Sequence, residues 1–298
     1  YQQFLQYSHR YSYEFLLEKP SILGNLGPVT CETLRQYYQA LQSVMENEES
    51  VNSVVTTFGG LAITSRGRQI LSEDWTRKAA KMLFLLLISF YDQPMNRESL
   101  MTLLWPDADS RTSRNNFKVT LNCLLNILDP ERMPRTSGTF IHKERTSLQF
   151  STSEECYLDV RDFEQFVTRG RVLLAHHTAE GQALLQKGLA LYKGDYLCGE
   201  VLNEPLLQKR DRLKLLALNG GTELANSYVN QKKYRQSIIW AEWILAIDPC
   251  WEEAYRILLI SYGIQKDIAM VKQWYRRCCQ VLNRELCMPV SEQTEELY

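Results

Sequence analysis

Residues 109–128 read DSRTSRNNFKVTLNCLLNIL, and this stretch decides the fold of the middle of the chain. Its apolar residues recur at spacings of three or four, which predicts a helix with one buried stripe. The members of that stripe are Phe117, Leu121, Leu124 and Leu128. The Asp-Pro pair at residues 129–130 is expected to end the helix.

The opposite face of the same helix carries side chains that suit DNA. They are Arg111, Asn115, Lys118, Asn122 and Asn126, with Arg114 on the border between the two faces. Arg and Lys donate to guanine or neutralise phosphate, and Asn pairs with adenine in the major groove. Any solvated helix face can have this composition, so the interpretation depends on the neighbouring elements.

Those neighbours predict a winged helix-turn-helix over residues 53–150. Short strands are expected at residues 54–58, 61–64 and 68–70, followed by a helix over 75–91 with Ser72 or Asp74 as its N-cap. Asn96 should cap a short helix that ends at Trp105-Pro106. After the 109–128 helix, residues 139–141 and 148–150 alternate as a hairpin.

The tip of that hairpin carries Lys143 and Arg145 on either side of Glu144. A basic tip predicts a wing that contacts the neighbouring minor groove or phosphates. The alternative is an ordinary turn with soluble residues, which the intervening Glu144 favours.

Residues 151–298 predict a helical domain built from repeats. Leu224 and Leu258 lie 34 residues apart, as do Tyr228 and Tyr262, which is the tetratricopeptide period. Residues 1–52 predict two further helices and a polar linker. The expected fold class is therefore mainly α with a small β part, in three regions: 1–52, 53–150 and 151–298.

Charge is almost balanced over the 298 residues, with 34 Lys and Arg against 35 Asp and Glu. Only residues 53–150 are basic, with 13 positive and 9 negative side chains. An anionic partner must therefore be met locally.

Cofactor and enzyme chemistry find little support in the sequence. The eight cysteines show no CxxC spacing, and most lie in apolar helical patterns, which favours reduced thiols and a cytoplasmic location. His176-His177 is an isolated pair, and Gly220-Gly221 lacks a phosphate-binding context. No apolar run approaches the length of a membrane span. We expect no cofactor, no metal, no catalysis and no membrane partner.

Several segments resemble the Streptomyces antibiotic regulatory protein (SARP) family. Residues 58–61 (FGGL), 103–108 (LLWPDA), 115–119 (NNFKV) and 158–164 (LDVRDFE) are similar to its winged-helix DNA-binding domain, which is of the response-regulator type. Residues 190–197 (ALYKGDYL), 252–256 (EEAYR) and 282–286 (LNREL) are similar to the bacterial transcriptional activator domain that follows it. The resemblance implies an activator that binds direct repeats in promoters near RNA polymerase.

The sequence thus predicts a sequence-specific, double-stranded DNA-binding activator that can self-associate on repeated half-sites. Because the chain begins at Tyr1 within an amphipathic pattern, we expect it to be the C-terminal part of a larger signalling regulator. The alternative is a protein-interaction scaffold or ligand-sensing module whose winged helix does not bind DNA.

Overall fold

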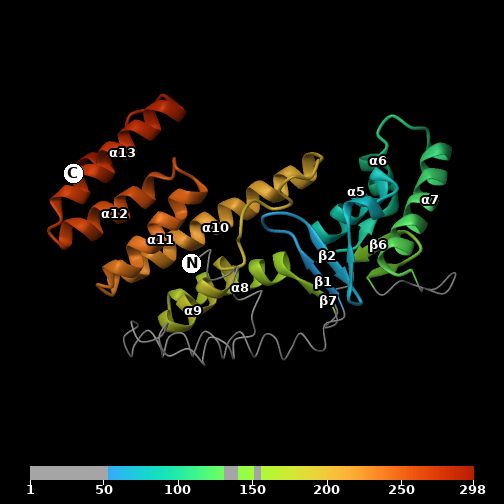
Figure 1. The fold of residues 1–298 in the computed structure, drawn as a ribbon, viewed down its shortest axis with the longest axis horizontal. Helices are drawn as coiled ribbons and strands as arrows, with labels where there is room; N and C mark the ends of the chain where they lie inside the picture. Colours follow the sequence, from blue (N-terminus) through green and yellow to red (C-terminus); the bar gives the residue numbers. More distant parts are fainter. Residues whose placement is uncertain (1–52, 131–139, 151–155) are drawn as a thin grey trace, which may run out of the picture. The chain divides into compact units, whose positions relative to one another are not determined.

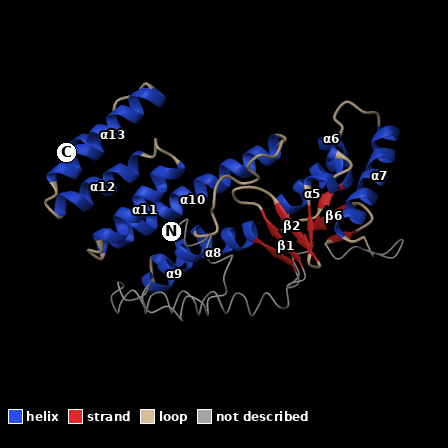
Figure 2. Cartoon of the chain, in the orientation of Figure 1, coloured by secondary structure: helices blue, strands red, loops and turns tan. Residues whose placement is uncertain are grey.

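The computed structural model describes residues 53–130, 140–150 and 156–298 (Figure 1). The helices predicted before residue 52 lie outside these ranges. Residues 53–298 form one compact unit. Its described part is mainly helical with two small sheets, which confirms the predicted fold class (Figure 2).

The first sheet has four strands in the order β3-β2-β1-β7. Strands β1 (Ser53–Thr56), β2 (Ala62–Ser65) and β3 (Arg68–Ile70) form an antiparallel meander, as the alternating pattern predicts. The fourth strand, β7 (Cys156–Leu158), pairs in parallel with β1. This strand comes after residue 150, so the sheet extends past the end predicted for the winged-helix region.

Helix α5 (Lys78–Ser89) follows the 3-10 turn η1 (Ser72–Asp74). The predicted helix start was wrong, because Arg77 is the N-cap residue and its side chain makes no capping hydrogen bond. Residues 83–89 are all buried. A helix that is apolar on every side must lie inside the fold, and α5 accordingly forms the centre of this region.

The remaining elements complete a winged helix. Strand β4 (Met95–Asn96) leads into α6 (Arg97–Leu104), which Asn96 caps by accepting a hydrogen bond from the Glu98 N–H. Helix α7 (Ser110–Leu128) follows, and then the hairpin of β5 (Ile141–Lys143) and β6 (Ser147–Phe150). The small sheet has the order β4-β6-β5, so the hairpin is attached to the strand before α6.

The rest of the chain is a succession of helices: α8 (Asp159–Leu174), α9 (Thr178–Leu189), α10 (Glu204–Asn230), α11 (Tyr234–Ile247), α12 (Glu252–Ile264), α13 (Ile268–Leu286) and α14 (Glu292–Glu296). Successive long helices pack on each other as in stacked repeats. Of the repeat residues, Leu224, Leu258 and Tyr228 are buried. Tyr262 is only half-buried.

The buried apolar residues form two clusters that meet within α10. The first runs from Val55 to Tyr228 and joins the winged helix to α8, α9 and α10. The second begins at Leu218 and joins the end of α10 to α11, α12 and α13. The winged helix therefore shares one core with the start of the helical region.

Buried polar contacts strengthen this shared core. The Asp159 carboxylate, at the start of α8, accepts hydrogen bonds from the Thr57 N–H (2.7 Å), the Thr57 hydroxyl (2.6 Å) and the Phe58 N–H (3.1 Å). Next to them, Gly59 has φ +77° and lies against the Lys193 carbonyl, at a spot where a Cβ would be 3.1 Å from that oxygen. Glycine is therefore required at this contact.

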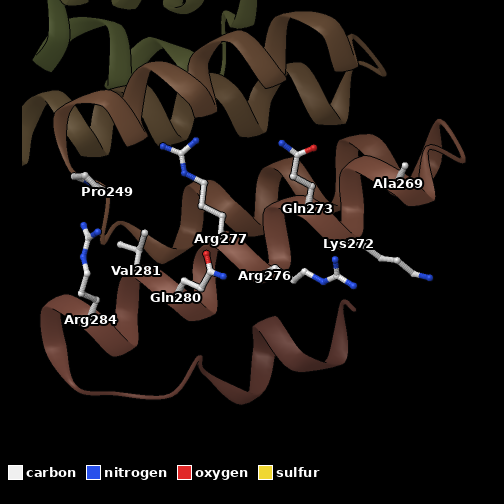
Figure 3. Close-up of a pocket in the computed structure, with 9 residues that line it drawn as sticks. All are labelled: Pro249, Ala269, Lys272, Gln273, Arg276, Arg277, Gln280, Val281 and Arg284. Atoms are coloured by element: carbon white, nitrogen blue, oxygen red, sulfur yellow. The ribbon is translucent and has the colours of Figure 1, made fainter.

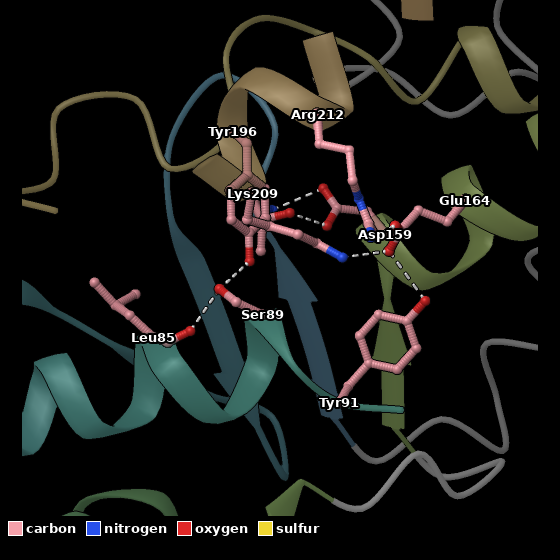
Figure 4. A network of polar contacts seen from close by, with 9 residues as sticks. Leu85, Ser89, Tyr91, Asp159, Glu164, Tyr196, Lys209 and Arg212 are labelled. Atoms are coloured by element: carbon pink, nitrogen blue, oxygen red, sulfur yellow. Dashed lines mark hydrogen bonds and ion pairs between the residues drawn. The ribbon is translucent and has the colours of Figure 1, made fainter. Parts of the chain in front are cut away.

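A second network lies at the end of α5 (Figure 4). The Glu164 carboxylate of α8 accepts hydrogen bonds from the Tyr91 hydroxyl (3.1 Å), the Lys209 ammonium (2.7 Å) and the Arg212 guanidinium (2.6 Å). The hydroxyls of Ser89 and Tyr196 lie 2.7 Å apart. Burial lowers the pKa of Lys209, although Glu164 opposes that shift. These contacts fix the winged helix to α8 and α10.

Candidate nucleic-acid interface

The start of α7 is fixed by Asp109. Its carboxylate accepts hydrogen bonds from the N–H groups of Arg111 (2.9 Å) and Thr112 (3.0 Å) and from the Thr112 hydroxyl (2.6 Å). The hydrogen bonds from Thr112 hold the pKa of this carboxyl below its ordinary value. Asp109 is therefore ionised at neutral pH and satisfies donors that would otherwise be unpaired at the helix start.

The buried side of α7 agrees largely with the predicted stripe. Phe117, Leu124 and Leu128 are buried, whereas Leu121 is half-buried and Leu125 is buried in addition. Ser113 and Thr120 complete the inner face. Small polar residues on a buried helix face are not visible to a search for apolar spacing.

All six residues that the sequence assigns to the outer face of α7 are exposed: Arg111, Arg114, Asn115, Lys118, Asn122 and Asn126. Four of their side chains, those of Arg111, Arg114, Asn115 and Lys118, make no hydrogen bond or ion pair with another described residue. These four occupy the first half of the helix. Their donors and charges are available for a ligand.

The second half of α7 has different surroundings. Asn122 and Asn126 line a groove of about 440 Å³ together with Arg68, Thr76 and Cys123. The Thr76 hydroxyl and the Cys123 thiol lie 3.3 Å apart across it. The structure thus divides the six residues into four at the start of the helix and two beside β3 and η1.

Val119 is a residue of the outer face that the sequence interpretation missed. Its side chain is 48% exposed between the cationic and amide side chains. An exposed apolar group on such a face can contact the methyl group of thymine. The signal in the sequence was a β-branched residue outside the buried stripe.

The hairpin tip lies close to the start of α6. The Arg97 guanidinium donates to the Glu144 carbonyl (2.6 Å), and the Ser147 hydroxyl donates to the Glu144 carboxylate (2.7 Å). Arg145 is exposed and Lys143 is half-buried. Glu144 therefore stabilises the turn, while Arg145 projects from it. Arg97, which the sequence interpretation did not single out, positions this tip.

Within the described ranges, no group of three or more His, Cys, Asp and Glu side chains is arranged to hold a metal ion. The seven cysteines in these ranges are free thiols. No helix there is both long and apolar enough to cross a bilayer.

Comparison with known proteins finds a family model that matches part of the chain. Residues 158–298 match the family model described as bacterial transcriptional activator domain. The match includes α8 to α14 and begins at the last residue of β7. No curated protein sequence matches the chain.

Two solved structures match parts of the chain, and only the first has a TM-score above 0.5. A structure of Mycobacterium tuberculosis EmbR in complex with a low-affinity phosphopeptide has a TM-score of 0.60 at 17% identity. The similarity covers 83% of this chain and 64% of that one. The C-terminal TPR-containing domain of a putative FK506-binding protein from Plasmodium falciparum has a TM-score of 0.35 at 17% identity, over 47% of this chain and 85% of that one.

Proposed function

We propose that this chain binds specific double-stranded DNA sequences through α7 and activates transcription in the cytoplasm. The observation that carries the proposal is a group of four exposed side chains at the start of α7 that have no partner among the described residues: Arg111, Arg114, Asn115 and Lys118. In helix-turn-helix proteins the first residues of the second helix reach the base edges. The activator domain at residues 158–298 supports the transcriptional role.

Each side chain has a distinct part in this proposal. Arg114 donates to guanine and Asn115 pairs with adenine, whereas Val119 contacts a thymine methyl group. Arg111 and Lys118 neutralise phosphates and fix the register of the helix in the groove. Asn122 and Asn126, which line the groove beside β3, extend the interface only at its far end.

Arg145 and Lys143 on the hairpin act as the wing and contact the adjacent backbone or minor groove. The buried contacts of Asp159 and Glu164 hold the winged helix in a constant orientation relative to α8 and α10. The activator domain can then present its outer helices to RNA polymerase at a defined distance from the bound site.

The number of cations limits the affinity of one copy. About four phosphates per copy gives a slope of log K against log salt near −4. Two copies on direct repeats about one helical turn apart would place both α7 helices on one face of the duplex. The second copy should therefore supply affinity and steepen the salt dependence.

The proposal is tested by selecting sites from a random duplex library with residues 1–298. Affinity is then measured by fluorescence anisotropy for a selected and a scrambled duplex. We expect the selected site to bind at least about tenfold more tightly, and Lys118→Ala to weaken both complexes. Arg169→Ala, an exposed arginine on α8, is the matched control and should change neither.

Failure to enrich any sequence at low salt would overturn DNA recognition and favour the protein-interaction scaffold. A salt slope that does not steepen with a second half-site would overturn the cooperative arrangement alone.

A further inference from the structure

Helix α13 is the last long helix of the repeat region, and its two sides differ sharply. Val271, Trp274, Cys278 and Leu282 are buried on one side, where α13 packs against α12. Among the described helices, α12 is the one against which α13 packs extensively, and the opposite side of α13 lines a groove together with Pro249. The last repeat of a stacked array needs a polar outer face for solubility, but this requirement does not fix the sign of the charge.

The charged residues on the outer side of α13 are all positive. This side carries four cationic residues and no acidic one: Lys272, Arg276, Arg277 and Arg284. Residues 151–298 as a whole have 18 basic and 20 acidic side chains, so this face is not an average sample of the domain. A face that served solubility alone would be expected to mix both signs.

The surroundings of these cations leave most of their charge uncompensated. Among the described residues, Lys272 and Arg276 form no ion pair, and Arg284 pairs with its exposed neighbour Glu285 at 2.7 Å. The Arg277 guanidinium lies over the Trp274 ring, 5.1 Å from its centroid. This contact fixes the direction of Arg277 without neutralising it.

The same residues line a groove of about 1130 Å³. Figure 3 shows Pro249 and Arg284 at one end and Ala269 and Lys272 at the other. Arg284 lies twelve positions after Lys272 along the helix, which corresponds to about 18 Å at 1.5 Å per residue. Val281 supplies apolar surface between the cations, Ala269 and Pro249 supply it at the two ends of the groove, and Gln273 and Gln280 supply amides.

We propose that this groove, hereafter the α13 groove, binds an acidic amphipathic helix of a partner protein. Its length fits three to four turns of such a helix, with carboxylates facing the cations and apolar side chains on the aliphatic surface. A nucleic-acid backbone would use the charge but not the apolar residues. The inference does not depend on DNA binding by α7.

Each exposed ion pair adds little by itself, roughly two- to fivefold in affinity. Binding must therefore come from several pairs together with apolar contact, and should weaken with salt. Reversal of two of the four cations in Lys272→Glu/Arg276→Glu should lower the affinity of a bound peptide at least about tenfold. Both side chains are exposed, so the substitutions should leave the fold intact.

The experiment is a display selection of random 16-residue peptides on residues 1–298. Enriched peptides should contain Glu or Asp at helical spacing together with apolar residues. Synthetic copies should bind the parent chain and Arg169→Glu/Arg235→Glu equally, because those two arginines are exposed on other helices. They should bind Lys272→Glu/Arg276→Glu at least about tenfold more weakly.

Three results would overturn the proposal. One is the absence of acidic enrichment at low salt, and another is equal binding by the Lys272→Glu/Arg276→Glu chain. The third is equal affinity for peptides of the same composition in scrambled order, which would show unspecific charge attraction. An α13 variant with unchanged peptide binding and weakened DNA binding would instead assign the groove to nucleic acid. Failure of α7 to bind DNA would leave all these peptide measurements unaffected.

Discussion

α7 and α13 are both helices of 19 residues that turn a cationic face outward, yet their surroundings differ. α7 begins after the cap residue Asp109, and its first exposed turns mix Arg and Lys with Asn. α13 follows the last turn of a helical array, and its outer face mixes Arg and Lys with Gln and aliphatic residues. A cationic stripe therefore does not specify a partner by itself, because the side chains between the cations and the neighbouring elements differ between the two helices.

The largest expected effect is a loss of stability in only one of the two apolar clusters, of which the first contains residues of α7 and the second residues of α13. Leu258 is fully buried in the second cluster, and truncating a buried leucine to alanine costs about 2–5 kcal/mol. Leu258→Ala should lower the melting temperature of α11 to α13, followed by circular dichroism. DNA binding at 25 °C should persist, since α7 belongs to the first cluster.

Leu215→Ala is the matched control for that experiment, because Leu215 is 50% exposed on α10 and should change the midpoint little. An unchanged midpoint for Leu258→Ala would show that the repeat packing is wrong.

The next effect concerns base recognition by α7. Arg114→Ala or Asn115→Ala should cost about 1–3 kcal/mol on the selected duplex and relax the preference for one base pair. Affinity for specific and scrambled duplexes is the measurement. Arg276→Ala on α13 should leave both affinities unchanged. Equal losses on the two duplexes would show that the α7 residue contacts phosphate only.

A smaller effect is expected at the hairpin. Lys143→Ala combined with Arg145→Ala should flatten the salt slope of DNA binding by about two units if both contact phosphate. Removing two cations from α13, by Lys272→Ala and Arg276→Ala, should not alter the slope. An unchanged salt slope in the hairpin variant would show that the tip is an ordinary solvated turn that contacts no phosphate.

The smallest effect concerns Glu252, which holds the C-terminal segment next to α12. It accepts hydrogen bonds from the Ser291 N–H (2.8 Å) and the Ser291 hydroxyl (2.6 Å), and also from Thr294. Partial burial raises the pKa of Glu252, but these hydrogen bonds outweigh it and hold the pKa below its ordinary value. Their stabilisation is therefore complete above the unfolded pKa and is lost as pH falls through the lower folded value.

The protection of the α14 (Glu292–Glu296) amides against hydrogen exchange, relative to their intrinsic rates, should accordingly fall below about pH 4. Glu252→Gln should remove this pH dependence, whereas Glu253→Gln should retain it. Retention of the pH dependence in Glu252→Gln would assign it to another carboxylate.

Much of the winged helix could be predicted because its signals are local. The end of α7 at Leu128, the Asn96 cap of α6 and the hairpin after α7 follow from a few neighbouring residues each. The start of α5 was predicted too early, because Ser72 and Asp74 have the composition of an N-cap but form a separate 3-10 turn. Capping residues alone do not show which turn continues into a helix.

The candidate site was predicted as one stripe of six residues on α7, and the structure divides it. Helical spacing shows which residues leave the core, but not which neighbours they meet. Asn122 and Asn126 lie beside β3 and η1 because the first sheet packs near the end of α7. Val119 was missed because a β-branched residue is expected inside the fold.

The sequence by itself determined strands β1 to β3, the hairpin after α7, the 34-residue repeat and the exposed face of α7, since these depend on residues close together in the chain. Tertiary structure decided which faces are covered. Several contacts join residues about 100 or more positions apart. They are the pairing of β7 with β1, the hydrogen bond from Thr57 to Asp159 and the core shared by α5 and α10. Such contacts depend on how whole elements pack, and no local spacing encodes them.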